Sequence, residues 1–223
     1  MKRILFLLLL TIVFIGCSKN EDKIEALNVT TQELSLYADE SLSISAQSGN
    51  KITYTSENPL IAKVDESGKV TAHFIGETKI KVTDGVTSKE VKVIVTPKYT
   101  YFHEPIILVA SKEEFIEKYS NIGGQILTID DNTLCLFNRD TPKTYFYSYS
   151  NSILNGYKNI NLNTPINSYY TPSKIISWIK ERYVYVKQEG RSVFFASLDG
   201  KVSLAFTVSI NGDIATLLFS EIK

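Results

Sequence analysis

The sequence predicts a mostly β protein of two domains, an N-terminal β-sandwich followed by an α+β domain with an antiparallel sheet. From residue 28 to residue 95, short stretches of alternating apolar and polar residues are separated by turn residues, with no helical pattern between them. After that, helix-start signals alternate with strand patterns. Pro97 interrupts strand pairing between the two regions, so we place the domains at residues 24–97 and 98–223.

The first 23 residues have the pattern of a secretion signal and a tether. Lys2 and Arg3 precede an uninterrupted apolar stretch that runs to Ile15. This stretch is shorter than the ~20 residues that a helix needs to cross a bilayer. Residues 17–23 are mostly polar or charged, which is typical of a flexible tether. We therefore expect an exported protein whose signal peptide comprises residues 1–16.

The end of the apolar stretch, Phe14-Ile15-Gly16-Cys17, resembles the lipobox of bacterial lipoproteins, although that family usually has Leu where this chain has Phe14. The resemblance implies that Cys17 is lipidated and anchors the protein to a membrane. By similarity to lipoprotein sorting rules, Ser18 implies the outer membrane, and Glu21-Asp22 resembles the surface-export signals of some Gram-negative phyla. An ordinary signal peptide or an uncleaved anchor is the alternative.

Within residues 24–97 the alternation places one face of each strand in a core. The residues predicted to face the core are Leu34, Leu36, Leu42, Ile44, Ala46, Ala62, Val64, Val70, Ala72, Ile80, Val82, Val91, Val93 and Val95. Turns are predicted at Ser48-Gly49-Asn50, Glu66-Ser67-Gly68 and Asp84-Gly85.

The stretch from Tyr54 to Ala72, with its Ser-Glu-Asn-Pro turn, and the strand from Gly76 to Val82 together resemble the bacterial Ig-like domain of group 2. The resemblance implies a β-sandwich that serves as a scaffold. Tyr54 replaces the Trp or other aromatic residue usual in the family and preserves a large ring with a polar tip. His73 occupies a variable position of the family pattern, so we expect a surface histidine rather than a metal ligand.

Two helices are predicted in residues 98–223. Ser111-Lys112-Glu113-Glu114 is a capping box that starts a short helix. Its apolar face is predicted to consist of Phe115, Ile116 and Tyr119. Thr171-Pro172 offers an N-cap and a proline in the first turn of a second helix. The apolar residues at helical spacing there are Ile175, Ile176, Ile179 and Tyr183.

The C-terminal end is predicted to be a meander of three strands joined by the two-residue turns Asp199-Gly200 and Asn211-Gly212. The strands are expected near Ser192–Leu198, Val202–Ile210 and Ile214–Ile222, with Val202, Leu204, Phe206, Val208 and Ile210 on the buried face. Residues 125–138 and 144–149 would form corresponding strands after the first helix, giving a duplicated helix-plus-meander unit. The overall layout is similar to that of uncharacterised surface lipoproteins of gut-type bacteria, and no activity follows from that similarity.

Charge and motif content argue against several function classes. Removing Lys2 and Arg3 leaves 22 of the 24 basic residues against 24 acidic ones, which provides no basic field for nucleic acid. The two histidines, His73 and His103, lie in no metal-ligand spacing, and His103-Glu104 beside a proline has the pattern of a loop. Cys135 is predicted to be a small buried hydrophobe. We expect no metal, no cofactor and no enzymatic activity.

One group of aromatic residues in the sequence suggests a binding surface. Tyr145, Tyr147 and Tyr149 share one face of a predicted strand and could stack on sugar rings or anchor a protein partner. They could equally pack beneath a helix, which we favour for at least Tyr147. The leading hypothesis is a non-enzymatic, lipid-anchored outer-membrane protein, exposed to a glycan or a surface protein, in which the Ig-like module presents a binding or structural domain. The alternative is a surface hydrolase or inhibitor whose active groups converge only in the fold.

Overall fold

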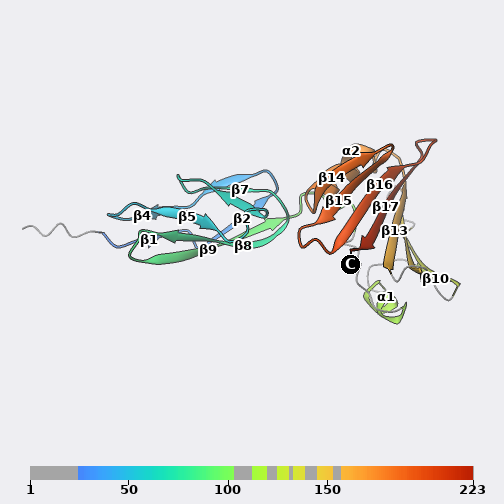
Figure 1. Ribbon diagram of the computed structural model, residues 1–223, viewed down its shortest axis with the longest axis horizontal. Coiled ribbons are helices and arrows are strands. Elements are labelled where there is room, and N and C mark those ends of the chain that lie inside the picture. The colour runs from blue at the N-terminus through green and yellow to red at the C-terminus, as the bar shows by residue number, and fades with distance from the viewer. Residues whose placement is uncertain are drawn as a thin grey trace, which may run out of the picture.

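The computed structural model describes residues 25–102, 112–119, 125–130, 133–138, 145–152 and 157–222, with most side chains between residues 112 and 159 outside the description. The predicted signal peptide, Cys17 and the tether lie outside the described residues. The described chain forms two β-rich bodies that follow one another along the long axis of the molecule (Figure 1). This arrangement confirms the predicted fold class, whereas the exact division at Pro97 stays a prediction.

The N-terminal body consists of nine strands. They are β1 (Asn28–Val29), β2 (Glu33–Tyr37), β3 (Ser41–Ser43), β4 (Ala46–Gln47), β5 (Thr53–Ser56), β6 (Ala62–Val64), β7 (Lys69–Ala72), β8 (Gly76–Thr83) and β9 (Ser88–Thr96). A four-stranded sheet has the order β2-β9-β8-β5, a three-stranded sheet has the order β3-β7-β6, and β1 pairs with β4. Strand β2 runs parallel to β9, and the other pairs are antiparallel.

The alternating pattern predicted most of this core correctly. Ile80, Val82, Val91 and Val93 are fully buried, and they lie in the same cluster as residues of the three-stranded sheet such as Val70. Leu42 is a wrong prediction, because 47% of its surface is exposed. It lies on β3, an edge strand of the three-stranded sheet, where the alternation continues but no second layer covers the side chain.

The turn before β7 depends on Gly68. Its φ of +81° is in the left-handed region, which favours glycine. A Cβ atom at this position would also lie 2.7 Å from Cζ of Tyr54. The large ring at residue 54 therefore requires a glycine at the turn that it covers, and these two features of the family pattern are linked by packing.

The C-terminal body combines two helices with one large sheet. Its elements are α1 (Lys112–Tyr119), β10 (Gln125–Asp130), β11 (Thr133–Asn138), β12 (Tyr145–Ser152), β13 (Tyr157–Pro165), α2 (Pro172–Lys180), β14 (Tyr183–Glu189), β15 (Ser192–Ser197), β16 (Val202–Val208) and β17 (Ile214–Glu221). The sheet has eight strands in the order β10-β11-β12-β13-β17-β16-β15-β14, and all neighbouring pairs are antiparallel.

This strand order fits the predicted duplication, with one more strand in each half. Each half is a helix followed by a four-stranded meander, and the last strands of the two halves, β13 and β17, pair at the centre of the sheet. Strands β13 and β14 were not predicted from the sequence. Among the described side chains of β13, the buried apolar ones are Ile160 and Leu162, and two such positions are too few to predict a strand from alternation.

Helix α2 covers one face of the sheet. The Thr171 side chain accepts a hydrogen bond from the backbone N–H of Lys174 at 3.3 Å, as the predicted N-cap requires. Ile175 and Ile179 are fully buried, together with Trp178. Tyr183 was predicted to extend this helix, but the helix ends at Lys180 and Tyr183 begins β14.

The remaining predictions in this domain have mixed outcomes. Helix α1 begins one residue after Ser111, which lies outside the described residues, and Ile116 on it is exposed. The three C-terminal strands are confirmed, but Ile210 is wrong as a buried residue, since β16 ends at Val208 and 84% of Ile210 is exposed in the turn. No helix among the described residues is both long and apolar enough to span a membrane.

Candidate functional site

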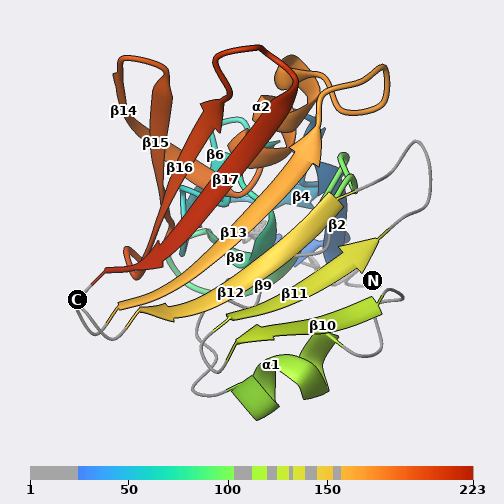
Figure 2. The ribbon, with the colours of Figure 1, turned by 90° about the vertical axis from the view of Figure 1, so that its right-hand side faces the viewer.

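The face of the large sheet that points away from α2 is the candidate site. Its described residues alternate with the buried ones on β13, β17, β16 and β15, and they are partly exposed. We call this surface the uncharged face, and it consists of Asn161, Asn163, Ser192, Phe194, Ala196, Ser203, Ala205, Thr207, Thr216, Leu218 and Ser220. Figure 2 shows these strands from this side, with α2 and the Ig-like domain behind them and no described element in front of β13, β17 and β16.

The register of the strands arranges the uncharged face in rows that cross the sheet. Leu218 on β17 is opposite Ala205 on β16, and Ala205 is opposite Phe194 on β15. Residues directly opposite one another in antiparallel strands share a face of the sheet. These three residues therefore form an apolar strip across three neighbouring strands, with Asn161 of β13 at its end.

Hydroxyl and amide groups flank the strip on both sides. On one side the Thr216 hydroxyl donates to Oδ1 of Asn163 at 2.7 Å, and the hydroxyls of Ser192 and Thr207 are 2.8 Å apart. On the other side Ser203 is opposite Ser220, and its hydroxyl donates to the Ser220 carbonyl at 3.4 Å. The polar rows are thus partly held in place by bonds within the sheet.

Two charged side chains of the edge strand β14 share this side of the sheet, because Lys187 is opposite Phe194 and Glu189 is opposite Ser192. Lys187, on the edge strand β14, places its ammonium 5.3 Å from the centre of the Phe194 ring. The same ammonium is 2.7 Å from the Glu189 carboxylate, and both side chains are more than half exposed. The nearest charges at this edge are therefore a mutually neutralising pair exposed to solvent.

A second feature is the junction between the domains, which contains a buried ion pair. The carboxylate of Glu181 accepts hydrogen bonds from the backbone N–H groups of Lys98 and Tyr99, each at 3.1 Å. The Arg182 guanidinium donates to the same carboxylate and to the Tyr99 carbonyl, also at 3.1 Å, and its centre lies 4.4 Å from the centre of the Trp178 ring. The segment that links the domains is therefore bound to the end of α2.

The Ig-like domain also contacts this end of α2 directly. The backbone N–H of Ile75 donates to the Glu181 carbonyl at 2.8 Å, and Leu198 of the C-terminal domain packs against the core of the Ig-like domain. Contacts between the two domains are therefore made by both backbone and side chains. Neither contact involves a residue type or spacing that the sequence marks as an interdomain anchor.

His73 lies at this junction and is not the surface histidine that was predicted. The residue is half-buried, and its Nε2 atom is buried with no hydrogen-bond partner. It lines two adjoining hollows of about 290 Å³ and 260 Å³, both of which also include Asp39 and Lys180. Among the described residues, no three His, Cys, Asp or Glu side chains lie together as a metal site would require.

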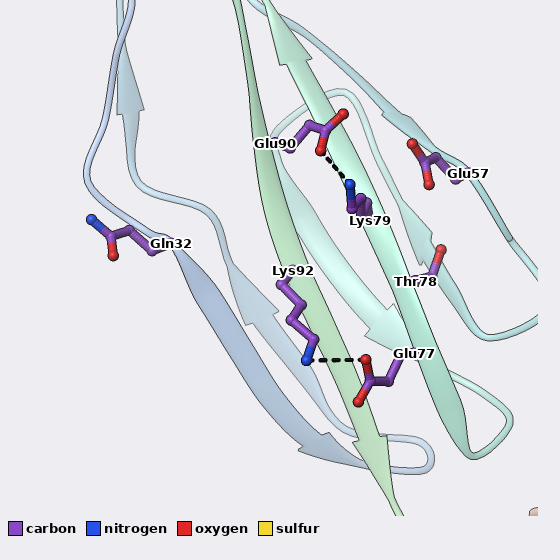
Figure 3. Close-up of a pocket in the computed structure, with 7 residues that line it drawn as sticks. All are labelled: Gln32, Glu57, Glu77, Thr78, Lys79, Glu90 and Lys92. Atoms are coloured by element: carbon purple, nitrogen blue, oxygen red, sulfur yellow. Dashed lines mark hydrogen bonds and ion pairs between the residues drawn. The ribbon is translucent and has the colours of Figure 1, made fainter.

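The hollow shown in Figure 3, about 410 Å³ in volume, lies on the outer face of the four-stranded sheet in the Ig-like domain. Two cross-strand ion pairs line it, Lys79 with Glu90 at 2.6 Å and Lys92 with Glu77 at 3.0 Å. All four side chains are roughly half exposed, and hydrogen bonding to Glu90 raises the pKa of Lys79. This surface is an ion-paired face in contact with water.

For the three tyrosines predicted as a binding surface, the structure gives the position of the backbone alone. Tyr145, Tyr147 and Tyr149 lie on β12, and their side chains are outside the description. The register places Tyr147 opposite Leu162 and Tyr149 opposite Ile160. His103 and the side chain of Cys135 also lie outside the described residues.

Phe194, the aromatic residue of the uncharged face, was not among the site residues predicted from the sequence. A usable signal was present, because the residues that alternate with the buried positions of β16 are Ser, Ala and Thr, with no charge among them. An ordinary solvent-facing strand carries Lys or Glu at such positions, as β8 does.

Comparisons with known proteins identify the first domain. Residues 25–95 match the bacterial Ig-like domain (group 2) family. Such a domain fits a cell-surface or structural module. The match covers the nine-stranded body and none of the eight-stranded sheet.

The other comparisons are weaker. Among curated proteins, none matches the chain. Two solved structures are similar to it at low scores. Human protocadherin-24 EC1-2 has a TM-score of 0.30 and 11% identity, covering 66% of this chain and 91% of that one. Domains 5-6 of the S-layer protein SbsC have a TM-score of 0.29 and 14% identity, covering 89% of this chain and 84% of that one.

Proposed function

We propose that this protein is a non-enzymatic, lipid-anchored protein of the cell envelope whose Ig-like domain presents the uncharged face to a binding partner. Lipidation at Cys17 would tether the N-terminal end to the outer membrane. The Ig-like domain would then act as a spacer, and the C-terminal domain would be the binding unit.

The observation that carries this proposal is the direction of the uncharged face. Strands β1 and β4 lie at the end of the Ig-like domain that is far from the C-terminal domain, and β9 leads toward that domain (Figure 1). The uncharged face points away from the Ig-like domain (Figure 2). A lipid attached ahead of β1 would therefore leave this face at the far end of the molecule, where a partner can reach it.

The junction supports the same role. Glu181 and Arg182 are 4% and 8% exposed, and their bonds to Lys98 and Tyr99 leave the linking segment little freedom to rotate. A flexible linker would let the C-terminal domain turn in any direction, including toward the membrane. A fixed junction keeps the uncharged face at the end of the two-domain unit that lies opposite its N-terminal end.

The same carboxylate bears on the alternative of a surface hydrolase. Glu181 is a buried acid near a hollow, which is a usual sign of a catalytic group. Here its oxygens are already bound by two backbone N–H groups and a guanidinium. This arrangement suits a structural anchor and supports the binding role.

Anchoring is tested by Cys17→Ala, with Cys135→Ala as the matched control because Cys135 is the one other cysteine in the chain. A lipid anchor contributes about 0.8 kcal/mol per buried methylene, so its loss should release the protein from membranes. We expect the Cys17→Ala protein in the soluble fraction after a high-salt wash, and the control in the membrane fraction. A Cys17→Ala protein that stays with membranes would contradict the lipid anchor.

Orientation is tested by treating intact cells with protease. Cells that carry the wild-type protein should lose it, whereas a periplasmic marker protein should survive in the same sample. Protection of the protein together with the marker would contradict presentation at the cell surface.

A further inference from the structure

The apolar strip Leu218–Ala205–Phe194 and its polar flanks specify a kind of partner. We propose that the uncharged face binds a neutral glycan, with sugar rings lying over the strip and their hydroxyls directed to the flanking rows. This inference rests on the proposed function, because it assumes that the uncharged face is the binding surface. It adds the chemical class of the ligand.

The chemistry of a sugar ring matches that of the uncharged face. A sugar ring has an apolar face of C–H groups and a rim of hydroxyls that donate and accept hydrogen bonds. The Phe194 ring and the Leu218 side chain offer an apolar platform for the C–H face of the sugar, because aromatic rings pack well against C–H groups. Ser203 and Asn163 lie one row to either side, where hydroxyl and amide groups can bond to the rim.

The dimensions also fit a short segment of an oligosaccharide. Neighbouring strands are ~4.8 Å apart, so a strip across three strands is ~10 Å long, about the length of two sugar rings. The rows on either side lie two residues away along each strand, at ~7 Å from the strip. Ala205, at the centre of the strip, is small enough for a ring to approach the sheet between Phe194 and Leu218.

Charge distinguishes this ligand from acidic ones. An anionic polysaccharide or an acidic protein would need cations to meet its charges. None of the residues that form the uncharged face is charged, and Lys187 and Glu189, which lie on the same side of the sheet on β14, are paired with each other. A neutral ligand is the one that this surface can bind without leaving a charge unmatched.

A protein partner is the weaker match. Stable protein interfaces cover about 800 Å² on each partner and depend on central aromatic or arginine anchors. Phe194 is the single aromatic residue among those that form the uncharged face, and no arginine is among them. We therefore treat binding to protein as an outcome that would overturn the inference.

The test is a glycan array that carries neutral and acidic oligosaccharides, probed with the full-length protein in a detergent that has no sugar headgroup. The expected result is binding to neutral oligosaccharides. Raising sodium chloride from about 0.05 M to about 0.5 M should change the signal less than about twofold, because no charge pair contributes to it.

Two aromatic substitutions locate the binding surface. Phe194→Ala should lower the signal by about tenfold or more, as expected for a central anchor. Tyr185→Ala is the matched control, because Tyr185 lies on the neighbouring edge strand, 58% exposed, with its ring in an edge contact with core residue Phe195. Its loss should leave binding unchanged, and circular dichroism should show that both variants are folded at the temperature of the assay.

The outcomes separate this inference from the proposed function. Binding only to acidic glycans, salt-sensitive binding, or equal effects of Phe194→Ala and Tyr185→Ala would overturn the neutral-glycan inference. So would the absence of any glycan signal, or binding to a protein ligand that Phe194→Ala abolishes. In each of these cases protease exposure on intact cells would still decide the proposed surface role independently.

Discussion

The two domains are both built mainly from antiparallel strands, yet their outer sheet faces differ in charge. On β8 and β9 of the Ig-like domain the outward positions include Lys79, Glu90 and Lys92, which form ion pairs across the strands. On β16 and β17 of the C-terminal domain the outward positions are occupied by Ser, Ala, Thr, Leu and Ile. Both faces are directed away from a core, but only the first has the composition of a surface adapted to water alone.

This difference in charge indicates that the two domains have different roles. Charged residues on an exposed face keep it hydrated and discourage contact with other surfaces. A face without charges loses less hydration when a ligand covers it. We infer that the Ig-like domain is the spacer and that the C-terminal sheet is the part of the molecule that contacts a partner.

The largest effect is expected from the covered side of the large sheet. The register places Tyr147 opposite Leu162 and Tyr149 opposite Ile160, and both partners are fully buried. We expect Tyr147→Ala to lower the free energy of unfolding by about 3–5 kcal/mol, and the triple alanine variant of Tyr145, Tyr147 and Tyr149 not to fold.

Fluorescence of Trp178, the single tryptophan of the chain, reports unfolding of this domain. Tyr185→Ala, at an exposed edge, is the control and should change stability little. A stable triple variant would show that these tyrosines are not packed, and they would again become candidates for a binding surface.

A somewhat smaller effect is expected at the junction. Glu181→Ala removes the acceptor of the Lys98 and Tyr99 amides and leaves the buried Arg182 without its carboxylate, which typically costs about 3 kcal/mol or more. The domains should then unfold in two separate transitions, detected by Trp178 fluorescence for one and by circular dichroism for both.

Lys180→Ala, an exposed neighbour, should leave the unfolding profile of the wild type unchanged. If Glu181→Ala also unfolded as the wild type does, the junction would not be what fixes the orientation of the domains.

The Ig-like domain should show a specific sensitivity to acid. Backbone hydrogen bonds from Thr87, followed by the hydroxyl of Ser48, lower the pKa of Asp84 to about 2. Since the unfolded carboxyl has a pKa of about 3.9, this group contributes its full stabilisation above about pH 4 and loses it as the pH falls through about 2. Asp84→Asn should flatten the dependence of stability on pH in this window.

Asp213→Asn serves as a comparison for Asp84, because Asp213 lies in an exposed turn of the C-terminal domain. Denaturant unfolding of the Ig-like domain at pH 2, 3 and 5 provides the measurement. Equal pH dependence in the two variants would contradict the role assigned to the Asp84 turn.

The smallest effect is expected at the ion pairs of Figure 3. Lys79→Ala breaks the pair with Glu90, but both side chains are about half exposed and screened by solvent, so the loss of stability should be barely detectable by denaturant unfolding. Glycan binding should not change, because this face is not the proposed site. A clear loss of binding in Lys79→Ala would shift the candidate site to the Ig-like domain.

Local sequence patterns predicted the features that depend on neighbouring residues of the chain. The alternation at Val91, Val93 and Val95, the helix cap at Thr171 and the hairpin turn at Asp199-Gly200 all have local causes, and the structure confirms them. Leu42 and Ile210 follow the same alternation and are exposed, because alternation gives the side of a strand but not whether another layer covers it.

The candidate site depends on pairing between distant strands, which a local pattern does not contain. Phe194, Ala205 and Leu218 become one strip only through the register of β15, β16 and β17. The Glu181 anchor similarly joins residues more than 80 positions apart, since it binds Lys98 and Tyr99. Tyrosine-rich β12 attracted attention in the sequence because its aromatic residues are close together, whereas Phe194 is the one aromatic residue among those that define the uncharged face.

The most direct test of the account places a charge at the centre of the uncharged face. Cells that display the wild type, Ala205→Glu or Val86→Glu would be compared for retention on the neutral oligosaccharide that gives the strongest array signal. Val86, 80% exposed in a turn of the Ig-like domain, is the matched control for an added carboxylate. We expect Ala205→Glu to abolish retention and Val86→Glu to preserve it, with equal amounts of protein at the surface. Retention of the Ala205→Glu cells at the wild-type level would contradict the assignment of the uncharged face as the binding surface.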